Sequence, residues 1–188
     1  LAGNQVRAIA ADSSGNLWFG TDGQGLSRFH RDTSSFDSPF LEFRDLRILS
    51  LAAEGNRMYV GTSEGISVFL TDREEVKESY RRLGSMAKDT EVTAIEIYDG
   101  MLFAGTPDGI AWARLDQANL QDPDSWKSLV FTGPITDLVA ADGLVHAGGL
   151  SGVYTFDPTA NGFYLDFSNG GVTALGILGG IGVAATGD

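Results

Sequence analysis

One short pattern recurs along the whole chain. Each copy begins with an apolar run, passes through a turn rich in Asp, Gly and Asn, and reaches a second apolar run that ends in glycine. These glycines stand at positions 20, 61, 105 and 148, so that successive copies are 41, 44 and 43 residues apart. A fifth copy begins at Val172 and has Ala185 in place of the glycine. A regular period of this length is the signature of a repeat architecture.

Each copy predicts a small antiparallel sheet. Turn pairs such as Asp99-Gly100 and Asp142-Gly143 supply the positive φ angles of tight hairpins, and β-rich runs flank them. A fourth run follows in most copies, as at 163–167. Four strands at a period of about 40–45 residues predict an all-β fold, the β-propeller. We expect one domain over residues 1–188, with blades at 4–44, 45–90, 91–133 and 134–169 and half of a fifth blade at 170–188.

The second copy departs from this pattern. Thr71 and Glu74 have the spacing of a helix capping box, and Val76, Tyr80 and Leu83 follow at helical spacing. We therefore predict a short amphipathic helix over about 73–83. It would cover a sheet edge or dock a partner.

The turn and strands of the first copy carry a family resemblance. Residues 12–29 read Asp-Ser-Ser-Gly-Asn-Leu-Trp-Phe-Gly-Thr-Asp-Gly-Gln-Gly-Leu-Ser-Arg-Phe. This run resembles the two-component regulator propeller repeat, and the later copies match it less closely. The resemblance implies the periplasmic or extracellular sensing region of a hybrid histidine kinase, where such propellers often have seven blades. Residues 1–5 are too few to complete the fifth blade, so we expect either a longer parent chain, which we favour, or closure by another chain.

Composition excludes several functions. The formal net charge of −12 argues against nucleic acid and anionic membranes as main partners. The absence of cysteine excludes disulfides, Cys-ligated zinc and thiol catalysis. The uncharged stretch 171–187 is too short and too rich in glycine for a membrane span. No phosphate-binding loop or catalytic triad is apparent, so we expect neither a cofactor nor a metal.

Two further groups of residues have ordinary explanations. His146 occupies a position that holds an aromatic or apolar residue in the other copies, which favours a packed ring over a base or a metal ligand. Asp116, Asp122 and Asp124 lie in one loop, but their spacing fits turn chemistry better than a calcium loop.

The first strand of each copy supplies the candidate binding residues. In a propeller this strand lines the central channel, so equivalent positions form a ring. The second position of the run is occupied by Arg7, Arg47, Thr93, Thr136 and Thr173. Arginine binds carboxylates bidentately and threonine both donates and accepts, so the ring predicts an anionic or glycan-like small ligand. The alternative is a set of ordinary solvated channel residues, with Glu96 and Asp137 countering the arginines.

Three functions remain open at this point. The first is a non-catalytic ligand-sensing or recognition propeller outside the cytoplasm. The second is an enzyme of the streptogramin-lyase-like propeller class, whose repeats carry similar turns and which would need a metal and a base such as His146. The third is a structural propeller that binds a protein partner or self-associates through its incomplete fifth blade.

Overall fold

The computed structural model describes residues 1–131, 133–168, 170–178 and 181–186, with side chains up to Gly176. Within these residues the regular structure is β-strand, apart from one 3-10 turn at Pro123–Ser125. The all-β prediction is therefore confirmed. The chain forms two compact units: unit 1 comprises residues 1–82 and 88–92, and unit 2 comprises residues 83–87 and 93–188. The boundary lies between the second and third copies of the repeat.

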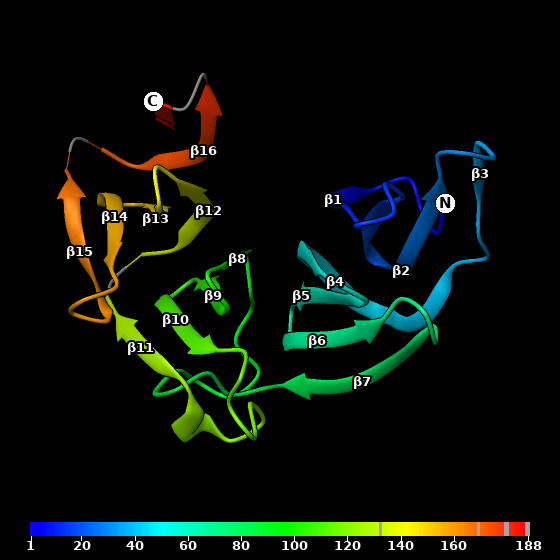
Figure 1. Cartoon of the computed structure of the whole chain (residues 1–188), viewed down its shortest axis with the longest axis horizontal. Helices are drawn as coiled ribbons and strands as arrows, with labels where there is room; N and C mark the ends of the chain where they lie inside the picture. Colours follow the sequence, from blue (N-terminus) through cyan, green and yellow to red (C-terminus); the bar gives the residue numbers. More distant parts are fainter. Residues whose placement is uncertain (132, 169, 179–180, 187–188) are drawn as a thin grey trace. The chain divides into compact units, whose positions relative to one another are not determined.

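Unit 1 is built on one antiparallel sheet with the strand order β1-β2-β4-β5-β6-β7, and β3 pairs with β2 (Figure 1). Its strands are β1 (Val6–Ala11), β2 (Leu17–His30), β3 (Ser35–Phe36), β4 (Phe40–Glu54), β5 (Arg57–Thr62), β6 (Gly65–Leu70) and β7 (Glu75–Tyr80). The long strand β4 belongs to two copies of the repeat. Its start pairs with the end of β2, and its second half pairs with β5.

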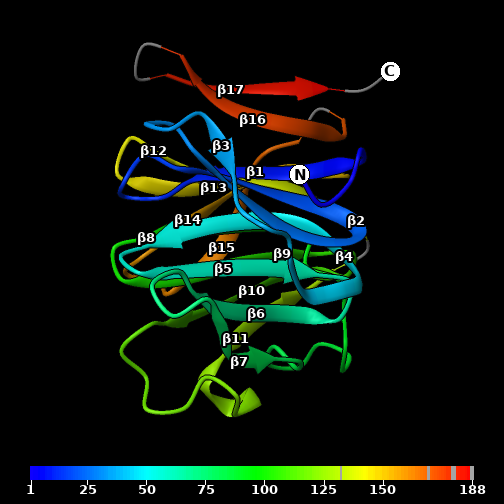
Figure 2. The ribbon, with the colours of Figure 1, turned by 90° about the vertical axis from the view of Figure 1, so that its right-hand side faces the viewer.

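Unit 2 contains two four-stranded antiparallel sheets and one hairpin. The first sheet runs β8 (Ala94–Tyr98), β9 (Met101–Thr106), β10 (Gly109–Arg114) and β11 (Lys127–Val130). The second runs β12 (Ile135–Ala141), β13 (Leu144–Gly149), β14 (Gly152–Asp157) and β15 (Gly162–Phe167), and the hairpin is β16 (Val172–Leu178) with β17 (Ile181–Thr186). The sheets lie against one another, and strands β4 to β7 of unit 1 form a similar ladder (Figure 2).

The predicted helix over 73–83 is wrong. Residues 75–80 form strand β7, which pairs with β6 as the fourth strand of the second copy. Thr71 lies in the preceding turn, where its hydroxyl donates to the carbonyl of Asn56 instead of capping a helix. Val76 packs against the unit 1 core and Tyr80 is buried, so burial in the sheet outweighs the helical spacing.

The Asp-x-x-Gly-Asn-x-Trp turn of the first copy has a clear physical basis. The carboxylate of Asp12 accepts hydrogen bonds from the backbone N–H groups of Ser14 and Asn16, from the side-chain amide of Asn16, and from the indole of Trp18. Burial tends to raise the pKa of Asp12, but these donors outweigh it and hold the pKa below 3.8. Trp18 is fully buried and stacks on Phe40 with ring centroids 5.6 Å apart. One carboxylate thus fixes both the turn and the main aromatic anchor of unit 1.

The glycine that ends the second strand makes room for the next copy. A Cβ on Gly20 would lie 2.2 Å from Cγ2 of Ile48, and one on Gly105 would lie 2.6 Å from Cγ2 of Ile135. A Cβ on Gly148 would lie 2.7 Å from Cγ1 of Val172. In each case the neighbour is a β-branched side chain on the first strand of the following copy.

A second glycine, at the start of the third strand, is needed for a different reason. Gly65, Gly109 and Gly152 have φ of +108°, +139° and +129°, values that side chains rarely tolerate. A Cβ there would also lie 1.9–2.3 Å from a carbonyl oxygen of the fourth strand. At this point the backbone of the third strand passes so close to the backbone of the fourth strand that only glycine fits.

A buried threonine closes the turn between the second and third strands. The hydroxyls of Thr21, Thr62 and Thr106 donate to the carbonyls of Gly25, Gly65 and Gly109 at 2.6, 3.0 and 3.0 Å. All three side chains are at most 2% exposed. The Gly-Thr pair of the repeat is therefore a structural unit, and the fourth copy replaces its threonine with Gly149.

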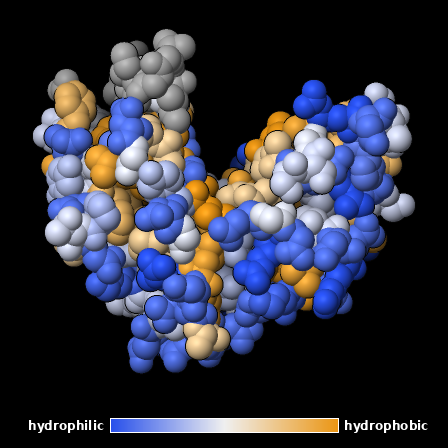
Figure 3. Space-filling view, in the orientation of Figure 1, coloured by the Kyte–Doolittle hydropathy of each residue, from blue (hydrophilic) through white to orange (hydrophobic). Residues whose placement is uncertain are grey.

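On the face shown in Figure 3, hydrophilic residues cover much of the surface of each unit.

Candidate functional site

The pairing register corrects the predicted ring of channel residues. In the first strand of four copies, β1, β4, β12 and β16, the register skips one residue, for example between Val6 and Ala8 in β1 and between Ile135 and Asp137 in β12. In β4 the skip falls between Ile48 and Ser50. The residues at this bulge are Arg7, Leu49, Thr136 and Thr173, and Thr93 holds the same place beside Ala94. Arg47 lies two residues earlier, so the predicted equivalence of Arg47 with Arg7 is wrong.

The threonines at this bulge bind backbone on both sides. The hydroxyl of Thr93 lies 3.1 Å from the carbonyl of Gly105 and 2.6 Å from that of Ile135. The hydroxyl of Thr136 makes the same two contacts, with Gly148 at 3.2 Å and Val172 at 2.6 Å. Each threonine therefore links its own sheet to the first strand of the next. Thr173 occupies the corresponding place and is exposed.

The two arginines lie in unit 1 and form ion pairs. Nε of Arg7 donates to Asp22 at 2.9 Å, and Arg47 pairs with Glu91. Both guanidinium groups remain about half exposed, with side-chain exposures of 45%. These pairs leave donors of Arg7 and Arg47 open to solvent, whereas the donor protons of Thr93 and Thr136 are committed to the backbone.

Two carboxylates lie on inner strands of unit 2. Asp137 accepts the backbone N–H of Leu175 at 2.8 Å, so it joins β12 to β16. Burial raises the pKa of Glu96, the backbone N–H of Ile97 opposes this, and the negative charge of Asp137 adds to the rise. The charge that acts on the pKa of Glu96 is thus that of another carboxylate of the same unit, and Glu96 does not counter the arginines as expected.

The two histidines are held by hydrogen bonds. Nε2 of His30 lies 3.0 Å from the carboxylate of Asp37. Nδ1 of His146 lies 2.9 Å from the hydroxyl of Thr155, which in turn lies 3.1 Å from the carboxylate of Asp166. Because the single hydroxyl proton of Thr155 goes to Asp166, the ring of neutral His146 must carry its proton on Nδ1. The structure thus fixes the tautomer of His146.

The carboxylates of the 116–124 loop do not converge. Asp116 pairs with Arg114, and Asp122 accepts the backbone N–H of Asp124 as the cap of the 3-10 turn. Across the described residues, no group of three His, Cys, Asp or Glu side chains is placed to hold a metal ion. Trp126 lies directly before β11, between the 3-10 turn and the strand. It is 5% exposed and donates its indole N–H to the carbonyl of Leu120.

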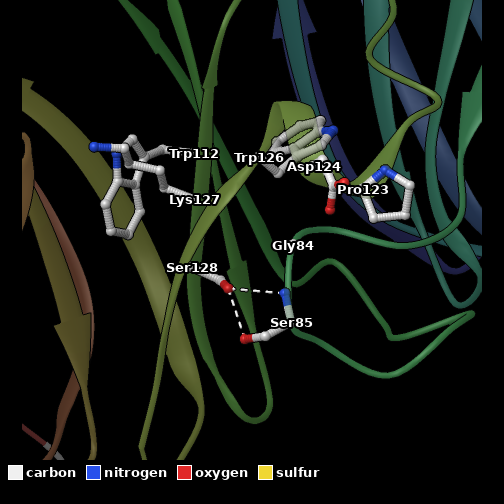
Figure 4. Close-up of a pocket in the computed structure, with 8 residues that line it drawn as sticks. All are labelled: Gly84, Ser85, Trp112, Pro123, Asp124, Trp126, Lys127 and Ser128. Atoms are coloured by element: carbon white, nitrogen blue, oxygen red, sulfur yellow. Dashed lines mark hydrogen bonds between the residues drawn. The ribbon is translucent and has the colours of Figure 1, made fainter.

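A pocket of about 670 Å³ opens at the outer strand of the β8–β11 sheet, wholly within unit 2 (Figure 4). We call it the rim pocket. Lys127 lies beside Trp112, its cross-strand partner, while Pro123 and Asp124 lie beside Trp126 (Figure 4). Its floor includes Gly84, Ser85 and Ser128. Sequence reasoning missed this site, because its residues come from three separate segments that only the sheet brings together.

Comparison with known protein families finds a match for the first copy of the repeat. A family model described as "Two component regulator propeller" matches residues 1–23. Residues 1–23 thus match the two-component regulator propeller repeat. This confirms the resemblance found in the first copy. A search of curated proteins finds no match.

Solved structures extend the comparison to nearly the whole chain. The extracellular domain of the putative one component system BT4673 from B. thetaiotaomicron is 16% identical, with a TM-score of 0.79, and the match covers 98% of this chain and 26% of that one. The extracellular domain of the putative hybrid two component system BT3049 from the same organism is 22% identical, with a TM-score of 0.66, covering 85% and 22%. PorZ, a surface component of the type-IX secretion system of Porphyromonas gingivalis, is 20% identical, with a TM-score of 0.67, covering 91% and 23%.

These likenesses confirm the β-propeller fold class. The chain spans about a quarter of the length of each of these three structures. Within the described residues, no helix has the length and apolar character needed to cross a membrane.

Proposed function

We propose that this chain is part of a non-catalytic recognition propeller in the extracytoplasmic input region of a signalling protein. The observation that carries the proposal is the agreement between the matched repeat and the likeness of almost the whole chain to extracellular domains of putative one- and two-component systems. A propeller suits this role because its rigid sheets present loops and side chains without moving them.

The distribution of polar side chains also favours recognition over catalysis. Thr93, Thr136 and Asp137 bond to backbone groups of the neighbouring strands. These side chains hold the sheets together, and none of them is paired with a base in the manner of an activated nucleophile. No observation on the described residues favours the lyase-like reaction.

Ligand binding near the inner strands of unit 1 remains part of the proposal. Arg7 and Arg47 keep exposed donors that suit a carboxylate or a polyhydroxylated ligand. Loss of the response to a ligand after Arg7→Ala with Arg47→Ala, at unchanged stability, would support this assignment. An unchanged response would refute the ligand site at Arg7 and Arg47.

The test of the main proposal uses the native protein in its own cells. We expect a protease added to cells with a permeabilised outer membrane to cleave within residues 1–188, because the propeller lies outside the cytoplasmic membrane. We also expect deletion of the propeller to abolish the signalling output without removing the protein. Protection in these permeabilised cells, with cleavage only after the cytoplasmic membrane is lysed, would refute the extracytoplasmic assignment.

The likeness to PorZ supports a second candidate, a propeller that assembles with other surface proteins. This candidate predicts a stable complex that survives purification and an unaltered signalling output after deletion. Size-exclusion chromatography of the native protein with mass analysis of the co-eluting chains separates the two.

A further inference from the structure

We propose that the outer face of the first copy's sheet binds another sheet of the same repeat, one that carries glycine where the fifth copy has Ala185. We call this surface the first-sheet face. All of its residues lie in unit 1, so the surface belongs to one compact body. The inference goes beyond the proposed function, because it assigns an interaction surface whatever the propeller recognises. The first-sheet face comprises Val6, Ile9, Leu17, Phe19, Phe29 and Phe36 from β1, β2 and β3.

These side chains point away from the second copy and form one continuous apolar surface. Trp18 belongs to the core shared with copy 2, and successive residues of a strand point to opposite faces, so Phe19 lies on the outer side. Ile9 is the cross-strand partner of Phe19, and Phe36 is that of Phe29. The ring of Phe36 lies 5.7 Å from that of Phe19 and 4.9 Å from that of Phe29. Ile9 and Phe36 are 60% and 44% exposed, and Figure 3 shows hydrophobic residues at the surface around β1.

The equivalent positions are buried in later copies. The pairing registers align Val6 with Ile48 and Ile135, each directly before the bulge of its strand. Ile48 and Ile135 are 0% exposed, whereas Val6 is 37% exposed. The residues equivalent to Phe19 are likewise 0% exposed, namely Val60 and Ala147. Because the first copy keeps apolar residues at positions that copies 2 and 4 bury, its face has the character of an interface.

In copies 2 and 4, the sheet that covers this face comes from the preceding copy. Val60 belongs to the same core cluster as Trp18 of copy 1. Phe163 holds the position of Phe36 in copy 4, and its ring lies 6.0 Å from that of Phe103 in copy 3. We expect Phe36 to meet an aromatic ring in the same way. The partner that fits the first-sheet face is therefore another sheet of this repeat, with an aromatic residue on its second strand.

Val6 adds a requirement for glycine. A Cβ on Gly20 would lie 2.2 Å from Ile48, so the sheet that covers Ile48 needs glycine at the end of its second strand. Val6 is β-branched and holds the same position, so its partner needs glycine there too. The fifth copy has Ala185 at this position and Val183 at the aromatic position. It lacks both features, which argues against pairing of the first-sheet face with the fifth copy of this chain or of a second copy.

We place the partner sheet in the same polypeptide, outside residues 1–188. This chain spans about a quarter of the length of three similar structures. A sheet tethered in the same polypeptide meets the first-sheet face at a high effective concentration, whereas a sheet on a separate protein does not.

Cysteine labelling of the native full-length protein tests whether the face is covered. Residues 1–188 contain no cysteine, so the peptide that carries Val6→Cys is identified by mass spectrometry after digestion. Ser13→Cys, in an exposed turn of the same copy, is the matched control. Each rate of modification by N-ethylmaleimide is divided by the rate in denaturant, which removes differences in thiol reactivity. We expect Val6→Cys to react at least tenfold more slowly than Ser13→Cys, and equal rates would overturn the inference.

Photocrosslinking from position 36 identifies the partner. The amino acid p-benzoyl-L-phenylalanine in place of Phe36 keeps an aromatic side chain and crosslinks to nearby C–H bonds on irradiation. We expect a crosslinked peptide from the same polypeptide outside residues 1–188, with a strand that ends in glycine. A crosslink to residues 181–186, to a strand without that glycine, to a second copy or to another protein would overturn the inference, and so would the absence of a crosslink. A crosslink between two chains raises the mass on a denaturing gel.

Substitution of the identified glycine tests the fit itself. Glycine to alanine should lower the melting temperature of the native protein, because the new methyl group meets Val6. Val6→Ala in the same background should recover most of that loss, and a loss that persists without the Val6 side chain would overturn the inference. Failure here leaves the proposed function intact, because deletion of the propeller tests signalling without reference to this surface.

Discussion

Replacing Gly105 with alanine tests whether the recurring glycine exists to admit a side chain from the next sheet. Gly105 has no left-handed backbone conformation, so a methyl group adds no backbone strain. The methyl carbon would lie 2.6 Å from Cγ2 and 3.0 Å from Cβ of Ile135, and 3.2 Å from Cβ of Ala94. Ile135 is fully buried in the unit 2 core and cannot turn outward. The two sheets must therefore separate locally or distort.

Overpacking of this kind costs about 1–3 kcal/mol of unfolding free energy. At about 2–4 °C per kcal/mol for a chain of this size, the melting temperature should fall by about 2–12 °C. Ile135→Ala alone should cost about 2–5 kcal/mol through its cavity. In the Ile135→Ala background, however, Gly105→Ala should lose most of its cost, since the closest contact, with Cγ2, is gone and the two that remain, at 3.0 and 3.2 Å, can be relieved by small shifts. The coupling free energy of the double-mutant cycle then equals most of the single-mutant cost.

Urea unfolding followed by tryptophan fluorescence gives the four free energies of the cycle. Gly109→Ala is the contrasting variant, because Gly109 has φ of +139° and its Cβ would lie 2.1 Å from the carbonyl oxygen of Leu129. It should be at least as destabilising as Gly105→Ala and should not be rescued by trimming Ile135. A Gly105→Ala variant as stable as the wild type, or one whose cost persists without the Ile135 side chain, would refute the reasoning.

Three other variants probe separate contacts. Thr106→Val should lower the unfolding free energy by about 1–3 kcal/mol, because it leaves the buried carbonyl of Gly109 without its hydrogen-bond donor. Thr106→Ser keeps the hydroxyl and should keep most of the stability. Equal stability of the two variants in urea would contradict this reasoning. Burial tends to raise the pKa of Asp37, but Arg28 and His30 hold it below 3.8, so Asp37 contributes stability above pH 3.8 that is lost as the pH falls through its lower folded-state pKa. Arg28→Met should therefore weaken the fall of the urea midpoint as the pH drops below 3.8, and an unaltered pH dependence would show that the pair of Arg28 and Asp37 does not contribute. The pKa of Glu96 is raised above 4.5 in the fold, so its ionisation lowers stability as the pH rises through that region; Glu96→Gln should be more stable than the wild type at pH 7 and lose that advantage below pH 4.5.

Much of the fold could be predicted because its signals are local and repeated. The turn around Asp12 and the recurring glycines each belong to a few consecutive residues, and the repeat shows them several times over. The helix prediction failed for the opposite reason. Val76 and Tyr80 satisfy both helical spacing and the alternation of a strand, and the choice depends on β6, which offers a free edge. Local spacing contains no information about that edge.

The candidate site was harder to predict, because it depends on register and on distant segments. Arg7 is itself the bulge residue of β1, whereas Arg47 lies two residues before the bulge residue of β4, and nothing in the sequence marks which residue of a strand forms the bulge. The contacts of Thr93 with Ile135 and of Thr136 with Val172 likewise cross from one copy to the next. The rim pocket needs Ser85, Asp124 and Ser128 together, which only the finished sheet achieves.

The fit between each recurring glycine and the β-branched residue of the next copy bears on how such chains can be duplicated or recombined. Gly20 and Ile48 form one matched pair, and Gly105 and Ile135 another, so the complementary surfaces straddle the boundary between repeats. A crossover placed at that boundary would separate each glycine from the β-branched residue that it fits and would pack it against a residue from an unrelated repeat. One placed just after the first strand would transfer the pair intact. The unit that can be exchanged intact is therefore shifted by one strand from the sequence repeat. Grafted or shuffled blades should be joined just after the first strand of a copy.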